Sequence, residues 1–302
     1  MGVPLQALHV IGIRYRDSHL APGDARGLDA YAAAGVYEAA GVPVTVSEPR
    51  FPEEARTGVE ENDLGVLGGV IAEHVAAASR DGKAILMTGG NCSHITGVFG
   101  GLQDAHGPSI RVGLVWFDAH GDFNTPQTTL SGMYGGMPVA VCAGLGYPTW
   151  RERSHIVAPL PTDRIVMVDV RNLDPDEERL IRAVGIPIAA VAPDRPGVDL
   201  AAAVQDLAAR CDLLYLHVDT DVLDERFTPD HGTKEPNGPD VEQVLAAIDT
   251  VMATGKVGVY AVVAVNAGGP HRDECLAPAF ELIRGGLAAW RRYGMAPLRR
   301  QP

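Results

Sequence analysis

The stretch VGLVWFDAHGD, residues 112–122, joins an apolar run to a cluster of polar side chains. Residues 112–118 read as a buried strand, which runs directly into the cluster of Asp118, His120 and Asp122. Alternate side chains of an extended chain lie on one face, so the three polar groups should converge. Two carboxylates and an imidazole bind a divalent cation well, and the carboxylates would repel each other without one. The stretch therefore predicts a metal site at a strand end rather than a solvated acidic turn.

Short apolar, β-branched runs alternate with longer amphipathic segments along the chain. The strand candidates are 8–13, 43–47, 84–89, 112–118, 165–170, 186–191, 213–219 and 257–265. The helix candidates are 29–40, 62–80, 176–184, 200–210, 241–253 and 276–293. Most strand candidates are apolar on both faces, which is typical of a parallel sheet covered by helices. No Ser/Gly-rich linker or repeat divides the chain, so the sequence predicts one α/β domain over residues 1–302.

Two further strand candidates lead into residues that bind metals. One ends in Asp219, and Asp221 lies on the same face of the extended chain. The other, 84–89, is followed by Cys92 and His94, and either could reach the same site. In parallel α/β sheets the chemistry lies beyond the carboxyl ends of the strands. Four carboxylates and an imidazole exceed what one cation needs, so we expect two cations that share carboxylates.

Composition excludes several classes of protein. The 302 residues include 25 Lys and Arg against 38 Asp and Glu, which gives a net charge of −13. This balance argues against a nucleic-acid groove or an anionic membrane surface as partner. Four cysteines are too few for a disulfide framework, so we expect reduced thiols and a cytoplasmic protein. No apolar stretch reaches the roughly 18 residues of a membrane span, and no signal peptide is recognisable.

These segments, in their order along the chain, resemble the ureohydrolase superfamily, which includes arginase, agmatinase and formiminoglutamase. The matching stretches are GGNCS (89–93), DAHGD (118–122), 124–132, 171–175 and DTDVLD (219–224), the last followed by Glu225 where proline is usual. The resemblance implies a three-layer α/β/α, arginase-like domain with an eight-stranded, mostly parallel sheet, in agreement with the strand candidates. It also implies two Mn²⁺ ions as cofactors and a small amidine or guanidino compound as substrate.

The resemblance further implies a role for each matching residue. One metal would be held by Cys92, Asp118, Asp122 and Asp219, and the other by Asp118, His120, Asp219 and Asp221. Asp122 would also be catalytic, because it would orient the hydroxide that attacks the amidine carbon. Asn124, Ser131 and Asp174 match positions that bind the carboxylate and the amine of an amino acid.

Cys92 stands where the family motif GGDHS has a metal-binding histidine. A cysteine there resembles the branch of the family that hydrolyses N-hydroxyarginine in cycloserine biosynthesis. A thiolate adds a negative charge that imidazole lacks, which should weaken the Lewis acidity of the cations. It is also a softer ligand than Mn²⁺ prefers, so Zn²⁺ or Fe²⁺ is a further candidate. The alternative is that His94 binds the metal and Cys92 is a buried spectator.

Two side chains of the family are replaced by small residues. Gly135 stands where arginase has a proton-shuttling histidine, and Ala264 stands where the family has a glutamate that pairs with the guanidinium. Without that carboxylate, a strongly basic guanidinium loses its charge-assisted partner. A less basic amidine with a better leaving group depends less on both side chains. The sequence therefore favours N-hydroxy-L-arginine, cleaved to ornithine and hydroxyurea, over arginine.

Two alternatives remain. The substrate could be another guanidino or formimidoyl compound, or the chain could be a homologue that binds metal without turnover. Retention of His120 and the four aspartates argues against the second. His231, in the loop after the second acidic cluster, could approach the substrate or lie on the surface. A homo-oligomer is compatible with the resemblance.

Overall fold

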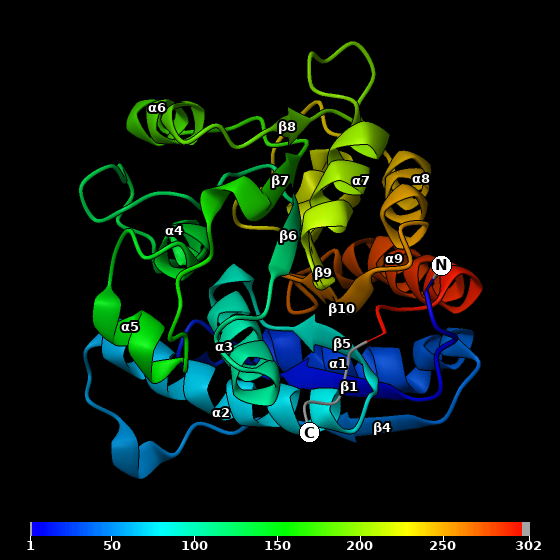
Figure 1. The fold of residues 1–302 in the computed structure, drawn as a ribbon, viewed down its shortest axis with the longest axis horizontal. Helices are drawn as coiled ribbons and strands as arrows, with labels where there is room; N and C mark the ends of the chain where they lie inside the picture. Colours follow the sequence, from blue (N-terminus) through cyan, green and yellow to red (C-terminus); the bar gives the residue numbers. More distant parts are fainter. Residues whose placement is uncertain (1, 298–302) are drawn as a thin grey trace.

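The computed structural model describes residues 2–297 and has an eight-stranded sheet at its centre (Figure 1). The strands are β1 (Leu8–Ile13), β4 (Val44–Ser47), β5 (Ala84–Gly89), β6 (Val112–Phe117), β7 (Ile165–Val168), β8 (Ile188–Ala189), β9 (Leu213–Asp219) and β10 (Val257–Val263). They lie in the order β4-β1-β5-β10-β9-β6-β7-β8, and every pairing is parallel. Each of the eight predicted runs thus contributes a strand to one parallel sheet.

The central strands form because their side chains are apolar on both faces. Every residue of β5, β6, β9 and β10 is buried, as expected for strands that contact helices on both sides. The prediction for β8, one of the two outer strands, needs correction. Only two residues of the predicted run 186–191 form a strand. Among the described strands it pairs only with β7, Val198 adds a single bridge to Ala189, and Pro187 directly before it has no N–H for a ladder.

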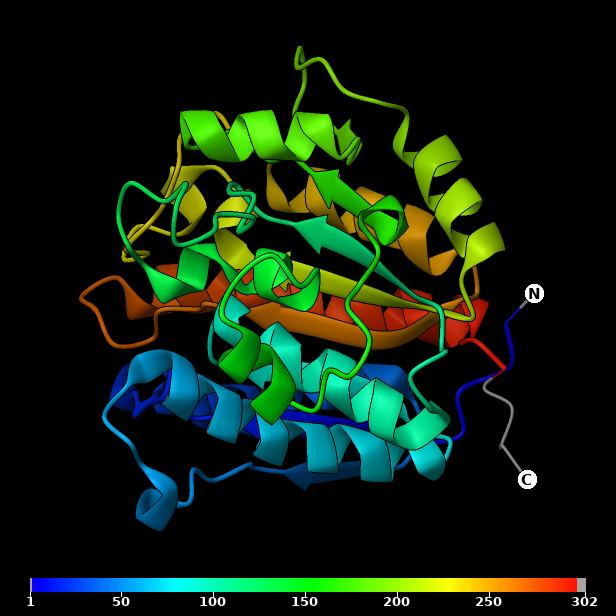
Figure 2. The same cartoon turned by 60° about the vertical axis from the view of Figure 1, so that its left-hand side comes forward.

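Helices cover both faces of the sheet and make the three layers expected (Figures 1 and 2). One apolar core joins the sheet to α1 (Pro22–Ala33), α7 (Leu200–Arg210), α8 (Val241–Met252) and α9 (Arg272–Tyr293). The core on the other face joins it to α2 (Glu60–Arg80), α3 (Ile95–His106), α4 (Pro138–Cys142) and α6 (Pro175–Ala183). Short α5 (Pro148–Arg153) packs through Trp150, and β2 (Tyr15–Arg16) and β3 (His19–Leu20) form a small hairpin. Within residues 2–297, no helix has the length and apolar character to cross a membrane.

Two helix predictions need correction. The segment 29–40 is not one helix, because α1 ends at Ala33 and a 3-10 turn covers Val36–Ala40. Gly35 between them has a φ of 59°, a left-handed conformation that ends a helix. Helix α3 was not predicted, because glycines interrupt its apolar pattern. A Cβ at Gly97 would lie 2.6 Å from the carbonyl oxygen of Gly68 in α2, so the glycine allows close helix packing.

Candidate metal centre

The carboxyl ends of three inner strands bring the predicted ligands together. Asp118 follows β6, Asp219 ends β9, and Cys92 begins a 3-10 turn after β5. The Cys92 Sγ lies 3.0 Å from Asp219 Oδ2 and 3.6 Å from Asp118 Oδ2. All three residues are buried. Segments more than 100 residues apart in the chain are therefore neighbours at these strand ends.

His120 and Asp122 join this cluster from the turn after β6. The His120 Nδ1 lies 3.2 Å from Asp118 Oδ1 and 3.2 Å from Asp221 Oδ2. Asp122 has a φ of 46°, which is uncommon for a residue with a side chain and is found mostly at functional sites. Its carbonyl oxygen accepts the N–H of Val139 at 3.0 Å, so α4 holds this turn in place.

The donor atoms fit more than one divalent cation. Within residues 2–297, three groups each place their donor atoms within 4.8 Å of one another. They are Cys92, Asp118 and Asp122; Asp118, His120 and Asp221; and Asp219, Asp221 and His231. Carboxylate and imidazole suit Mn²⁺, and thiolate suits softer cations such as Zn²⁺. Asp118 and Asp221 each belong to two groups, which fits cations that share carboxylates.

The electrostatics of the cluster also fit cations. Burial and the neighbouring carboxylates raise the pKa of Asp118 and of Asp122 well above the ordinary value. Burial and Asp219 likewise raise the pKa of the Cys92 thiol. Burial alone would lower the pKa of His120, but its contacts with Asp118 and Asp221 raise it to about 12. His120 in its protonated form supplies one positive charge among several buried acids, and divalent cations would supply more.

The structure distinguishes the surroundings of Cys92 and His94. The thiol of Cys92 lies among the carboxylates, whereas His94 points at the β2–β3 hairpin. The His94 Nε2 lies 3.0 Å from the carbonyl oxygen of Asp17, and its Nδ1 lies 3.2 Å from the N–H of Asn91. Both ring nitrogens of His94 therefore contact backbone groups outside the cluster.

His231 contributes to the cluster from a long loop, a placement that the sequence left open. The side chain is buried, with Nε2 3.4 Å from Asp219 Oδ1 and Nδ1 3.6 Å from Asp221 Oδ2. Thr233 in the same loop donates its hydroxyl to Asp221 Oδ2 at 3.0 Å. No sequence pattern marks this loop, apart from its position directly after the Asp219–Asp221 pair.

The residues predicted to bind an amino acid lie in two connected segments. The Asn124 side-chain amide donates to Asp174 Oδ2 at 3.1 Å, and the N–H of Leu130 donates to the same oxygen at 3.0 Å. Asp174 is also the N-cap of α6. Ser131 is exposed on the same loop, where its Oγ accepts the N–H of Met133 at 3.2 Å. Asn124 and Asp174 are therefore in contact, and Ser131 is beside them in the chain but open to solvent.

Gly135 and Ala264 lie beside segments of the cluster. A Cβ at Gly135 would be 3.6 Å from Asn91 Nδ2, next to the turn that carries Cys92. Ala264 follows β10, is 2% exposed and has a φ of 60°. Its carbonyl oxygen accepts the hydroxyl of Thr220, the residue between the two aspartates after β9, at 3.3 Å. Both positions therefore lie next to turns that carry members of the cluster.

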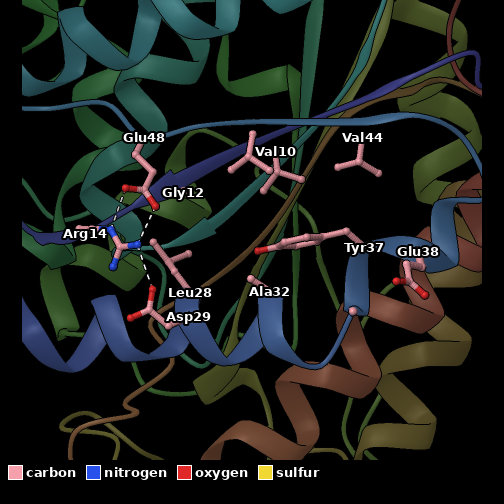
Figure 3. A pocket seen from close by; sticks show the side chains of 12 residues that line it. Val10, Gly12, Arg14, Leu28, Asp29, Ala32, Tyr37, Glu38, Val44 and Glu48 are labelled. Atoms are coloured by element: carbon pink, nitrogen blue, oxygen red, sulfur yellow. Dashed lines mark hydrogen bonds and ion pairs between the residues drawn. The ribbon is translucent and has the colours of Figure 1, made fainter.

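A pocket of about 350 Å³ lies elsewhere, between α1 and strands β1 and β4 (Figure 3). At one end, Arg14 contacts Asp29 at 3.0 Å and Glu48 at 2.7 Å. The hydrogen bond to Glu48 raises the pKa of Arg14 above its ordinary value. The Tyr37 ring lies across the other end (Figure 3). Its lining residues are distinct from those of the metal cluster, so this pocket is a separate feature of the sheet edge.

Comparisons with known proteins identify relatives of this chain. Residues 17–277 match a family described as the Arginase family. Arginase from Bacillus subtilis is 27% identical over 75% of this chain and 78% of its own length. Arginase from Entamoeba histolytica is 31% identical over 67% of this chain and 69% of its own length. The crystal structure of arginase from Bacillus subtilis matches with a TM-score of 0.80 at 25% identity, covering 93% of this chain and 98% of that one.

Proposed function

The chain belongs to the Arginase family, whose members are metal-dependent hydrolases of C–N bonds in linear amidines, and we propose that its substrate is N-hydroxy-L-arginine. In this reaction the oxygen of water adds to the amidine carbon. The bond from that carbon to the side-chain nitrogen breaks, and the nitrogen takes up a proton. The products are ornithine and hydroxyurea.

The observation that supports this substrate is the buried Ala264 at the carboxyl end of β10. A carboxylate at this position would pair with a guanidinium, and a methyl group cannot. An N-hydroxyguanidine is less basic than a guanidine, because the hydroxyl oxygen withdraws electrons. It therefore loses less binding energy than arginine when that charge-assisted partner is absent. Gly135 does not distinguish the two substrates, because the departing nitrogen is the ornithine amine for both arginine and N-hydroxyarginine.

We propose two Mn²⁺ ions as the cofactors, with Cys92, Asp118, Asp122 and Asp219 around one and Asp118, His120, Asp219 and Asp221 around the other. When bound, such ions supply Lewis acidity and lower the pKa of water. Asp122, held by α4, orients the water that attacks. Asp118 and Asp219 belong to both proposed ligand sets. Asn124, Ser131 and Asp174 bind the amino-acid end of the substrate.

A substrate panel tests the proposal. The Mn²⁺-loaded protein is assayed with N-hydroxyarginine, arginine, agmatine, guanidinobutyrate and formiminoglutamate, with urea, hydroxyurea and bound metal measured on the same sample. We expect two metals per chain and the highest kcat/KM for N-hydroxyarginine. Preference for another guanidino or formimidoyl compound would support the proposed type of reaction but contradict the proposed substrate. Two metals without turnover on the panel would favour the non-catalytic homologue.

Asp174→Asn tests recognition of the amino group of an α-amino acid. The asparagine keeps an oxygen to cap α6 but removes the negative charge. A lost charge-assisted hydrogen bond corresponds to roughly 10- to 100-fold in kcat/KM, and we expect most of it in KM. Asp176→Asn is the matched control, because Asp176 lies in the same first turn and pairs with Arg179. Equal kinetics for Asp174→Asn and the native protein would refute amino-acid recognition.

Cys92 variants test the thiol as a metal ligand. We expect Cys92→Ser to weaken the binding of one Mn²⁺ and to leave the other unchanged, since serine is a poorer ligand. Cys92→His should strengthen Mn²⁺ binding, because imidazole is a neutral donor in an already acidic site. Metal per chain after dialysis is the measurement, and Cys142→Ser, at a buried cysteine of α4, is the control. Two retained metals and full activity in Cys92→Ser would remove Cys92 from the ligand set.

A further inference from the structure

We propose that Glu235 positions His120 and thereby sets the affinity of one of the two cation sites. The proposal rests on the proposed metal centre and adds a residue that lies outside it. Glu235 belongs to the long loop that follows the Asp219–Asp221 pair. Among residues 2–297, its hydrogen bonds and ion pairs do not include the predicted substrate-binding residues. Its action is on the imidazole of His120.

The two ring nitrogens of His120 face different partners. Nδ1 lies 3.2 Å from Asp118 Oδ1 and from Asp221 Oδ2, inside the donor cluster. Nε2 points away from these atoms and lies 3.6 Å from Glu235 Oε1. A histidine that binds a metal through one nitrogen generally donates the N–H of the other to a carboxylate or a carbonyl. Glu235 occupies the place of that second partner.

The carboxylate of Glu235 is itself held in place. The Asn172 side-chain amide donates to Glu235 Oε1 at 2.5 Å, and residue Asn172 forms a parallel bridge with His120. The carbonyl oxygen of Glu235 accepts the Arg171 guanidinium at 3.1 Å and the N–H of Glu225 at 3.1 Å. The loop is therefore tied to the segment after β7, which lies beside the segment of His120. The backbone contacts fix the position of residue Glu235, and the Asn172 amide holds its carboxylate.

The arrangement has two consequences for metal binding. A carboxylate on the Nε2 side favours the tautomer with hydrogen on Nε2, which leaves the Nδ1 lone pair free for a cation. It also makes the imidazole a stronger donor. Both side chains are only about a quarter exposed (23% for His120 and 25% for Glu235), so water screens their interaction incompletely. Loss of Glu235 should therefore weaken the cation site that uses His120 and spare the one that uses Cys92.

Glu235→Gln tests this inference, because it removes the charge and keeps the size of the side chain. Mn²⁺ binding to the full-length protein is measured by calorimetric titration, together with the spin-coupled Mn²⁺ signal in electron paramagnetic resonance. We expect one binding step to weaken by about 10- to 100-fold, as is usual for the outer partner of a metal-binding histidine. The step affected should differ from the one that Cys92→Ser affects. The Tm of the metal-free protein should not fall, which separates positioning of His120 from a structural role.

The control is Glu225→Gln, an exposed acid of the same loop whose loss changes the net charge equally. Asn172→Ala is a second variant, and we expect it to weaken the same step to a smaller extent. Unchanged binding in Glu235→Gln, equal weakening of both steps, or a native protein that binds fewer than two Mn²⁺ would each overturn the inference. These results are independent of turnover. Absence of activity on the substrate panel with a selective shift in Glu235→Gln would overturn the proposed function alone.

Discussion

Asp118→Asn is expected to lower kcat/KM by on the order of 10³-fold or more and to remove at least one Mn²⁺ per chain. Loss of an outer partner alone reduces metal affinity or activity by about 10- to 100-fold, and Asp118 is proposed to touch both cations directly. The Asp118 carboxylate lies 3.6 Å from the Cys92 thiol on one side and 3.2 Å from His120 Nδ1 on the other. An asparagine has the same shape but lacks the charge that two cations would share.

The control for this prediction is Asp212→Asn. Asp212 directly precedes β9, at the amino end of the strand and away from the metal centre. It pairs with Arg111 at 2.6 Å. We expect this variant to keep its metal content and its kcat/KM. Metal content is measured by atomic emission after gel filtration, and kinetics are measured over a range of Mn²⁺ concentrations. Full activity and two bound metals in Asp118→Asn would contradict a shared carboxylate at the centre of the site.

The strands could be predicted from sequence because each one has a local signal. Runs such as 112–117 and 213–219 are apolar on both faces, and their position between two helix layers requires that pattern. Helix α3 has no such signal, because it contains several glycines, which have low helix propensity. The glycines allow α2 to approach closely, and this requirement is visible only in the structure. Gly35, which ends α1, is likewise a position whose left-handed backbone is visible only in the structure.

The same distinction applies to the metal centre. Asp118 and Asp219 could be predicted because each stands directly at the end of a buried strand. His231 and Glu235 lie in a loop without periodic pattern. The contacts of Arg171 with five carbonyl oxygens of this region hold the loop over the strand ends. Such long-range contacts leave no mark in the local sequence.

Removal of metal is expected to make the stability of the protein fall as the pH rises above about 6.5, because below that value the lowered pKa of the buried His217 has the opposite effect. The acids Asp118 and Asp122 have raised pKa values in the folded protein, so above their ordinary value of 3.8 the folded state binds more protons than the unfolded state. Glu177, whose pKa burial raises to about 7, acts in the same direction above 4.5, as does His120 above 6.5. Asp221 has a lowered pKa, and its opposite contribution is confined to pH values below about 4.

Each additional proton held by the folded state corresponds to a loss of about 1.4 kcal/mol of unfolding free energy per pH unit. Mn²⁺ reverses this trend, because cation binding displaces protons and becomes tighter as the pH rises. At 100 times its Kd, each bound ion adds about 2.7 kcal/mol of stability. Urea unfolding in EDTA and in excess Mn²⁺ should therefore give curves that separate as the pH rises, and Asp118→Asn should flatten the EDTA curve. Parallel curves with no pH dependence in EDTA would mean that the buried acids are already neutralised by groups of the chain, and a cation would then have no electrostatic reason to bind there.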